Sequence, residues 1–224
     1  MVAGGNERDS YNGAMPAIDT IKITERLFRI SPWSNSYPPN SFNPTHKPLG
    51  DLTAGRFDPV EPDHEGFIYV ARTVAGAVGE GILRNRVIDQ TGFIRRNLLT
   101  TLAFTELELT REISVANLTE PHLRRLNLSA SLTGCDPDNY DWTRMTASDI
   151  LKTADAAHGV LYNCRNNSSE EAFLLRKING LDEKALHIVR SEVILDDPKI
   201  LDLITNALST YRIYISEKKK NPFS

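Results

Sequence analysis

Residues 55–86 constrain the fold of this chain of 224 residues most strongly, because a turn, a strand and a helix follow one another there. A glycine and a proline bracket a turn at the letters RFD (56–58), and the letters FIYVA (67–71) favour a five-residue strand. Thr73 can cap a helix that runs to about residue 85. The stretch therefore predicts turn, strand and helix in quick succession.

The rest of the chain mixes short strands with a few helices. Alternating or apolar runs predict strands within 18–30, 98–115, 159–164, 172–178, 187–194 and 211–216. Helix starts are predicted at Thr119, at Thr146 with an end near Ala157, and at Asp197, which precedes a proline and a helix to about Leu208. Regular βαβ alternation is missing, so we expect an α+β domain with a mainly antiparallel sheet and flanking helices.

The chain divides by composition into an arm, one domain and a tail. Residues 1–17 have no sustained period and few aliphatic side chains, which predicts a disordered arm. Residues 18–216 are expected to form a single domain, and residues 217–224 a solvated basic tail. Residues 31–54 contain five prolines and are expected to be a long irregular loop, a kind of segment that is often functional.

Charge and composition exclude several classes of protein. The net charge of −3 argues against direct nucleic-acid binding. The longest apolar runs fall short of the roughly 18 residues that cross a bilayer, so no membrane association is expected. The two cysteines lie far apart and outside any CxxC pair, which favours a reducing compartment, and we expect a cytoplasmic protein.

The commoner catalytic signatures are missing from the sequence. It contains no GxGxxG, GxxxxGK[ST], HExxH or GxSxG motif, and its five histidines stand singly, so we expect no metal site. Arg56 in the turn, Tyr69 on the strand and Glu80 on the helix remain as candidates, with Arg29 upstream. The same residue types also occur as a surface ion pair, a packed ring and a solvated acid, so spacing alone leaves both interpretations open.

Several short motifs together resemble the RES domain family. They are LFRI (27–30), the proline-rich loop, GRFDP (55–59), IYVA (68–71), the helix with Glu80 and GVLYNCRNN (159–167), and the likeness covers about residues 25–180. The resemblance implies a fold similar to ADP-ribosyltransferases. It also implies a toxin that depletes NAD by cleaving the nicotinamide–ribose bond with water or phosphate, and that is neutralised by a helix-turn-helix antitoxin of the Xre class.

The resemblance assigns roles to the candidate residues. The arginine of the family's GR turn corresponds to Arg56, its strand tyrosine to Tyr69, its helical glutamate to Glu80 and an upstream arginine to Arg29. Glu80 is then expected to stabilise positive charge on the ribose, and Tyr69 to stack on the nicotinamide. Arg56 and Arg29 are expected to hold the pyrophosphate. NAD is the expected substrate, and no metal is required.

The chain departs from the family at its serine. Cys164 stands where the serine is expected, and a thiol is a poorer hydrogen-bond donor than a hydroxyl group. Ser168 or Ser169 can substitute as a polar contact to the substrate, or the position is structural and tolerates either residue.

Two other functions stay open at this point. Transfer of ADP-ribose to a protein would use the same cleft with another acceptor, and a non-catalytic binding module would keep the fold without the chemistry. The expected partners are NAD and an Xre-type antitoxin, and a homodimer is an open alternative for the assembly.

Overall fold

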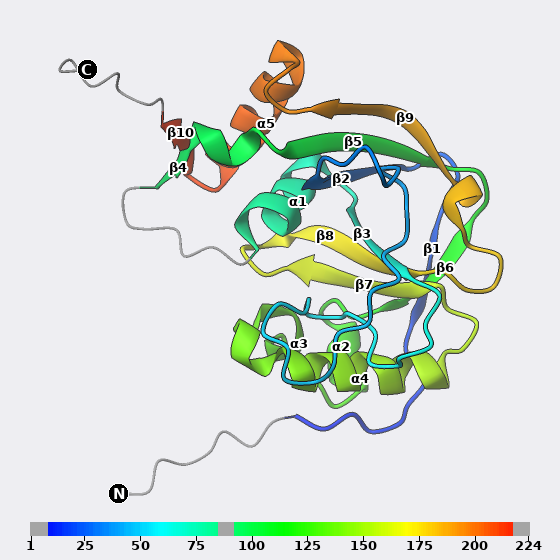
Figure 1. The fold of residues 1–224 in the computed structure, drawn as a ribbon. Coiled ribbons are helices and arrows are strands. Elements are labelled where there is room, and N and C mark those ends of the chain that lie inside the picture. The colour runs from blue at the N-terminus through cyan, green and yellow to red at the C-terminus, as the bar shows by residue number, and fades with distance from the viewer. Residues whose placement is uncertain (1–8, 85–91, 217–224) are drawn as a thin grey trace, which may run out of the picture.

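The computed structural model describes residues 9–84 and 92–216, and its centre is one strongly twisted sheet with its main helices packed against one face (Figure 1). The sheet has eight strands in the order β1-β6-β7-β8-β3-β2-β5-β9. Neighbouring strands are antiparallel except β6 and β7, which are parallel. A separate pair, β10 and β4, is parallel. The predicted α+β class with a mainly antiparallel sheet is confirmed.

Short strands alternate irregularly with helices and single helical turns along the described residues. The strands are β1 (Ile18–Ile21), β2 (Arg26–Pro32), β3 (Phe67–Ala71), β4 (Phe93–Arg95), β5 (Leu102–Leu109), β6 (Ile113–Asn117), β7 (Gly159–Cys164), β8 (Asn167–Arg176), β9 (Leu186–Val193) and β10 (Tyr214–Ser216). The helices are α1 (Val74–Val78), the π-helix η1 (Gly79–Leu83), α2 (His122–Arg125), α3 (Ser131–Gly134), α4 (Tyr140–Thr153) and α5 (Pro198–Thr210), with 3-10 turns η2 (Arg96–Leu99), η3 (Pro137–Asn139) and η4 (Glu183–Ala185).

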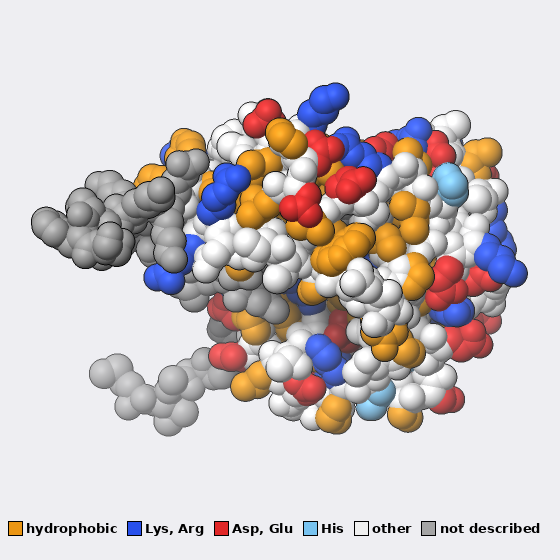
Figure 2. Space-filling model, turned by 45° about the horizontal axis from the view of Figure 1, so that its top comes forward, with side chains coloured by type: hydrophobic (Ala, Val, Ile, Leu, Met, Phe, Trp, Pro, Cys, Tyr) orange, Lys and Arg blue, Asp and Glu red, His pale blue; other side chains and the backbone are white. Residues whose placement is uncertain are grey.

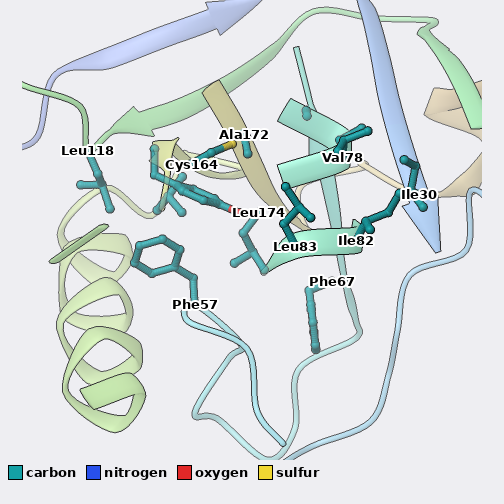
Figure 3. Packing of buried hydrophobic residues seen from close by; sticks show 14 of the residues in the cluster. Ile30, Phe57, Phe67, Val78, Ile82, Leu83, Leu118, Cys164, Ala172 and Leu174 are labelled. Carbon is teal, nitrogen blue, oxygen red and sulfur yellow. The ribbon is translucent and has the colours of Figure 1, made fainter. Parts of the chain in front are cut away.

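Each face of the large sheet has its own hydrophobic core. Strand β3 divides its side chains between them, because alternate residues of a strand point to opposite faces. Ile68 and Val70 belong to the smaller core, whereas Tyr69 packs against the larger one, which also contains the buried faces of α1, α4 and α5. Figure 3 shows part of this larger core, where Phe67 lies near Ile82 and Leu83 of η1. Tyr69 therefore points to the face opposite its two neighbours.

Local sequence signals placed several elements correctly. The strand at 67–71 and the strand at 159–164 have the predicted bounds. At α5 the Asp197 side chain accepts hydrogen bonds from the backbone N–H groups of Lys199 and Ile200, and Pro198 is the first helical residue, as predicted.

Other predicted elements were wrong in their bounds. The helix predicted to open at Thr146 begins at Tyr140, and Thr146 is buried within it. The strand predicted at 172–178 is longer at its start, because β8 begins at Asn167. The helix predicted from Thr73 to about residue 85 changes after Val78 from an α-helix to a π-helix, and residues 85–91 lie outside the described part of the chain.

The predicted disordered arm is only partly within the described residues. Residues 9–17 lie against the helical side of the domain instead of being free: the Trp142 indole donates a hydrogen bond to the Asp9 carbonyl, and the Asn12 amide donates to the Arg125 carbonyl. Residues 1–8 and the predicted basic tail at 217–224 lie outside the described residues. Within 9–84 and 92–216, the helices are too short or too polar to cross a membrane.

Candidate active site

The candidate site is a series of adjoining hollows lined mainly by residues of β2, the loop after β2, β3 and η1. A hollow of about 610 Å³ is lined by Tyr69, Glu80 and Arg84, and the same three residues line a neighbouring hollow of about 250 Å³. Arg29 lines this second hollow and a third one of about 470 Å³ under the loop after β2. One face of the molecule is visibly hollowed, with acidic and basic side chains around the depression (Figure 2).

Tyr69 connects strand β3 to the turn at residues 55–58. Its hydroxyl group donates a hydrogen bond of 2.8 Å to Asp58 and accepts one of 3.1 Å from the backbone N–H of Phe57. The second oxygen of Asp58 accepts from the backbone N–H of Gly55 at 2.7 Å. Burial and the nearby Asp58 carboxylate raise the pKa of Tyr69 well above its usual value. Tyr69 is therefore a neutral donor that fixes the turn beside the hollow.

Glu80 lies on η1, at the wall shared by the 250 and 610 Å³ hollows. The Tyr162 hydroxyl group donates a hydrogen bond of 3.0 Å to its carboxylate. Burial, followed by the charge of Glu80, raises the pKa of Tyr162 well above its usual value, so this tyrosine stays protonated. The next residue is Gly81, where a Cβ atom would lie 2.5 Å from the Ile30 carbonyl oxygen, so η1 packs closely on β2. Such π-helical turns are frequent at functional sites.

Arg56 is buried behind the hollows rather than exposed in them. Its side chain is 1 % exposed, its three guanidinium nitrogens make no hydrogen bond, and its Cζ lies 5.6–5.8 Å from the ring centres of Phe57, Tyr140 and Tyr162. Burial by itself lowers the pKa of Arg56, but the combined effect of Glu80, Tyr162 and Tyr140 raises it, and the net direction is upward. The structure thus brings Arg56 close to Glu80 as a buried positive charge, without placing it on the wall where a pyrophosphate would bind.

Arg84 is a site residue that the sequence reasoning missed. It lines the same two hollows as Glu80, and its guanidinium lies over the Tyr69 ring at 4.5 Å from the ring centre. A Cβ atom at Gly55 would collide with its Nη2. The available signal was the spacing, because residues four apart on a helix share a face and Arg84 follows Glu80 by four.

A comparison with family models identifies the chain. The model of the RES domain matches residues 26–197. The chain belongs to the RES domain family. This RES domain is also similar to a solved structure described as the crystal structure of the M. tuberculosis MbcT–MbcA toxin–antitoxin complex, with 16 % identity, a TM-score of 0.49, and coverage of 77 % of this chain and 85 % of that one. No curated protein matches it.

Arg29 of the RES domain lines the 250 Å³ hollow together with Tyr69 and Glu80. It extends from β2, is half-buried, and donates a hydrogen bond of 2.5 Å from Nη1 to the Pro39 carbonyl oxygen. Burial lowers its pKa to about 10, so it remains charged at neutral pH. The proline-rich loop is thereby attached to a cation at the edge of the hollows.

The three residues considered for the family's serine position, Cys164, Ser168 and Ser169, lie away from the walls of the three hollows described above. Cys164 is 2 % exposed, belongs to the larger core beside Ala172 (Figure 3), and its thiol lies 3.8 Å from the Gly76 carbonyl oxygen. Burial, and then the charge of Glu80, raise the pKa of the thiol. Ser168 is exposed on β8, and its carbonyl oxygen accepts a hydrogen bond from the Asn163 side chain. Their predicted contacts to substrate remain predictions.

Arg144 of α4 binds the main chain of the RES domain on both sides of the turn at residues 55–58. Its side chain is fully buried and donates hydrogen bonds to the carbonyl oxygens of Lys47, Pro48, Asp58 and Pro59. This buried guanidinium thus fixes both ends of residues 47–59, the segment that contains Gly55, Arg56 and Asp58, to α4. In residues 9–84 and 92–216, no group of three or more His, Cys, Asp or Glu side chains is arranged to hold a metal ion.

Proposed function

We propose that this RES domain is a toxin that cleaves the nicotinamide–ribose bond of NAD. One observation carries the proposal: the Glu80 carboxylate is fixed by Tyr162 at the wall of a 610 Å³ hollow that Arg84 also lines. The volume is within the range of about 300–1,000 Å³ that is usual for small-molecule sites. An oriented acid next to a cation suits a substrate that carries both a ribose and phosphate groups.

The residues suit the bond that is broken. Departure of nicotinamide leaves positive charge on the ribose, as in other glycosyl transfers through oxocarbenium-like states. Glu80 stabilises that charge because its position is fixed before the reaction begins. The leaving ring nitrogen is cationic in NAD and becomes neutral as it leaves, so no strong general acid is required. Tyr69, whose hydroxyl group is held by Asp58, lines the same hollow.

The acceptor in this proposal is water or phosphate. Purified protein is incubated with NAD in phosphate-free buffer and in buffer with phosphate, and nicotinamide, ADP-ribose and its phosphate are quantified by chromatography. We expect nicotinamide release by the wild type and a loss of at least about 100-fold in Glu80→Gln. Label that stays on protein would instead indicate ADP-ribosyl transfer. No turnover with either acceptor, together with identical behaviour of Glu80→Gln, would indicate a binding module.

The toxin part of the proposal has a separate test in cells. Expression in a bacterial host is expected to arrest growth and lower the NAD content, and Glu80→Gln at equal protein level is expected to do neither. Co-expression of a helix-turn-helix protein encoded next to the gene should restore growth. Normal growth with an unchanged NAD content on expression of the wild type would contradict a toxin.

A further inference from the structure

We infer that Arg84 and Lys47 form a binding site for a phosphate group beside Glu80, in place of the direct contact predicted for Arg56. The nature of the ligand rests on the proposed function, whereas the site itself rests on geometry. Both side chains line the 610 Å³ hollow, and so does Glu80. Arg56 is absent from the walls of all three hollows described above and is 1 % exposed.

The guanidinium of Arg84 is held in place before any ligand arrives. It lies over the Tyr69 ring, and the missing side chain of Gly55 leaves room for its Nη2. Its Nε is buried and makes no hydrogen bond. Burial by itself lowers the pKa of Arg84, but the combined effect of its neighbours, led by Tyr69 and Glu80, raises it, so the group stays charged. An oriented guanidinium is well suited to a planar, two-point contact with phosphate oxygens.

Lys47 supplies a second cation from the proline-rich loop. Its ammonium group donates one hydrogen bond of 2.6 Å, to the Thr53 carbonyl oxygen, and Thr53 also lies at the hollow. The backbone carbonyl of Lys47 is held by Arg144, so the main chain at this residue is anchored to α4. An ammonium group has three donors, and this hydrogen bond uses one of them.

The acids of the hollow do not neutralise these cations directly. Asp58 is satisfied by the Gly55 N–H and the Tyr69 hydroxyl group, and Glu80 accepts from Tyr162. In the residues the structure describes, no ion pair between an acid and either Arg84 or Lys47 falls within 4.0 Å. The wall of the hollow therefore has a cationic part, formed by Arg84 and Lys47, next to the acidic Glu80. The cationic part suits a phosphate group, and Glu80 suits the ribose next to it.

Two ligands could supply the phosphate group that Arg84 and Lys47 bind. It is either the diphosphate of the dinucleotide or free phosphate that acts as the acceptor. Inorganic pyrophosphate and inorganic phosphate serve as separate probes in titration calorimetry, which does not depend on turnover. Four proteins are compared: wild type, Arg84→Gln, Lys47→Gln and the control Arg124→Gln, whose side chain on α2 is 82 % exposed.

We expect at least one probe to bind the wild type and Arg124→Gln equally, and to bind Arg84→Gln and Lys47→Gln at least about 10-fold more weakly. Arg84→Lys should recover part of the affinity, and the thermal midpoint of each variant shows that it is folded. Equal binding of both probes by Arg84→Gln and wild type, or no binding of either probe by wild type, overturns the inference. Because this measurement needs no NAD cleavage, it can succeed even if the proposed function fails.

Kinetics with NAD then separate the two sources. If the site holds the diphosphate, Arg84→Gln raises KM for NAD at least about 10-fold with a smaller change in kcat, and phosphate inhibits competitively. If the site holds the acceptor, Arg84→Gln removes the dependence of the rate on phosphate and leaves KM for NAD unchanged. An unchanged KM together with an unchanged phosphate dependence would overturn the assignment even in an active enzyme.

Discussion

The Tyr162 hydroxyl group donates a hydrogen bond of 3.0 Å to Glu80 and so links the middle of β7 to the π-helix η1. Tyr162 is fully buried, so water does not replace this donor easily. The orientation of the acid at the hollow therefore depends on a residue that is 82 positions away in the sequence.

Removal of that donor should lower the rate of NAD cleavage. A hydrogen bond to a charged group contributes about 1.5–3 kcal/mol, so we expect Tyr162→Phe to reduce kcat/KM by about 10- to 100-fold. Tyr214→Phe is the matched control, because Tyr214 is 52 % exposed on β10. Steady-state kinetics of nicotinamide release measure the effect, and a Tyr162→Phe enzyme as active as Tyr214→Phe would show that Glu80 does not need this donor.

A methyl group at Gly55 should disturb the site without creating a cavity in the core. Its Cβ atom would collide with the guanidinium of Arg84 and the carboxylate of Asp58, and would lie 2.7 Å from the Tyr69 hydroxyl oxygen. We expect Gly55→Ala to lose about 1–3 kcal/mol of unfolding free energy and most of the NAD cleavage. Gly134→Ala is the control, since nothing lies within 4 Å of the added atom. Urea denaturation and activity assays compare the two variants, and equal stability would disprove the crowding at Gly55.

Arg144 should be among the residues on which stability depends most. Its replacement by methionine keeps an unbranched apolar side chain in the same space but leaves four carbonyl oxygens, two of them in buried and two in half-buried contacts, without their donor. Unsatisfied buried groups cost about 1–3 kcal/mol each, and partial relaxation leaves an expected loss of about 3 kcal/mol in unfolding free energy. Arg124→Met at an exposed site should lose less than about 0.5 kcal/mol. A similar denaturation midpoint for both variants would refute the anchoring role.

His158 should make the fold less stable in acid. It is 6 % exposed, its Nδ1 accepts a hydrogen bond of 3.2 Å from the Ser114 N–H, and burial lowers its pKa. Since the pKa is lower in the folded than in the unfolded chain, the unfolded chain takes up the proton first. The unfolding free energy should therefore decrease as the pH falls below about 6.5.

Urea titrations between about pH 5 and pH 8 measure this dependence, and a His158→Asn variant should show a smaller slope. His187→Asn is the control because His187 is exposed on β9. If His158→Asn and His187→Asn change the slope equally, His158 is not the group responsible.

Signals within a few residues predicted much of the fold. The five letters at 67–71 and the pair Asp197 and Pro198 act through neighbouring residues, and both predictions were confirmed. The helix start predicted at Thr146 was wrong, because a threonine followed by an acid three positions later resembles an N-cap. Helix α4 in fact begins at Tyr140 and has no side-chain cap. The pattern at Thr146 carries no information about residues 140–145, which are already helical.

The candidate site was only partly predictable, because its contacts connect distant parts of the chain. Tyr69, Glu80 and Arg29 line one hollow, and the roles that the resemblance assigns to them stay predictions. Neither Tyr162 nor Arg144 carries a local signal for its role, since each acts on a residue more than 80 positions away. The burial of Arg56 depends on three rings, two of them from distant elements, and this arrangement exists only after folding.

The attachment of residues 47–59 to Arg144 also affects the thermodynamics of ligand binding. A loop that becomes ordered only with its ligand loses conformational entropy at that step, and this loss weakens the affinity. In this RES domain the main chain on both sides of Gly55 is fixed by α4 before a ligand arrives. Binding to this wall should therefore proceed with little entropic opposition from the backbone, and the specificity of the site is set during folding rather than during the encounter.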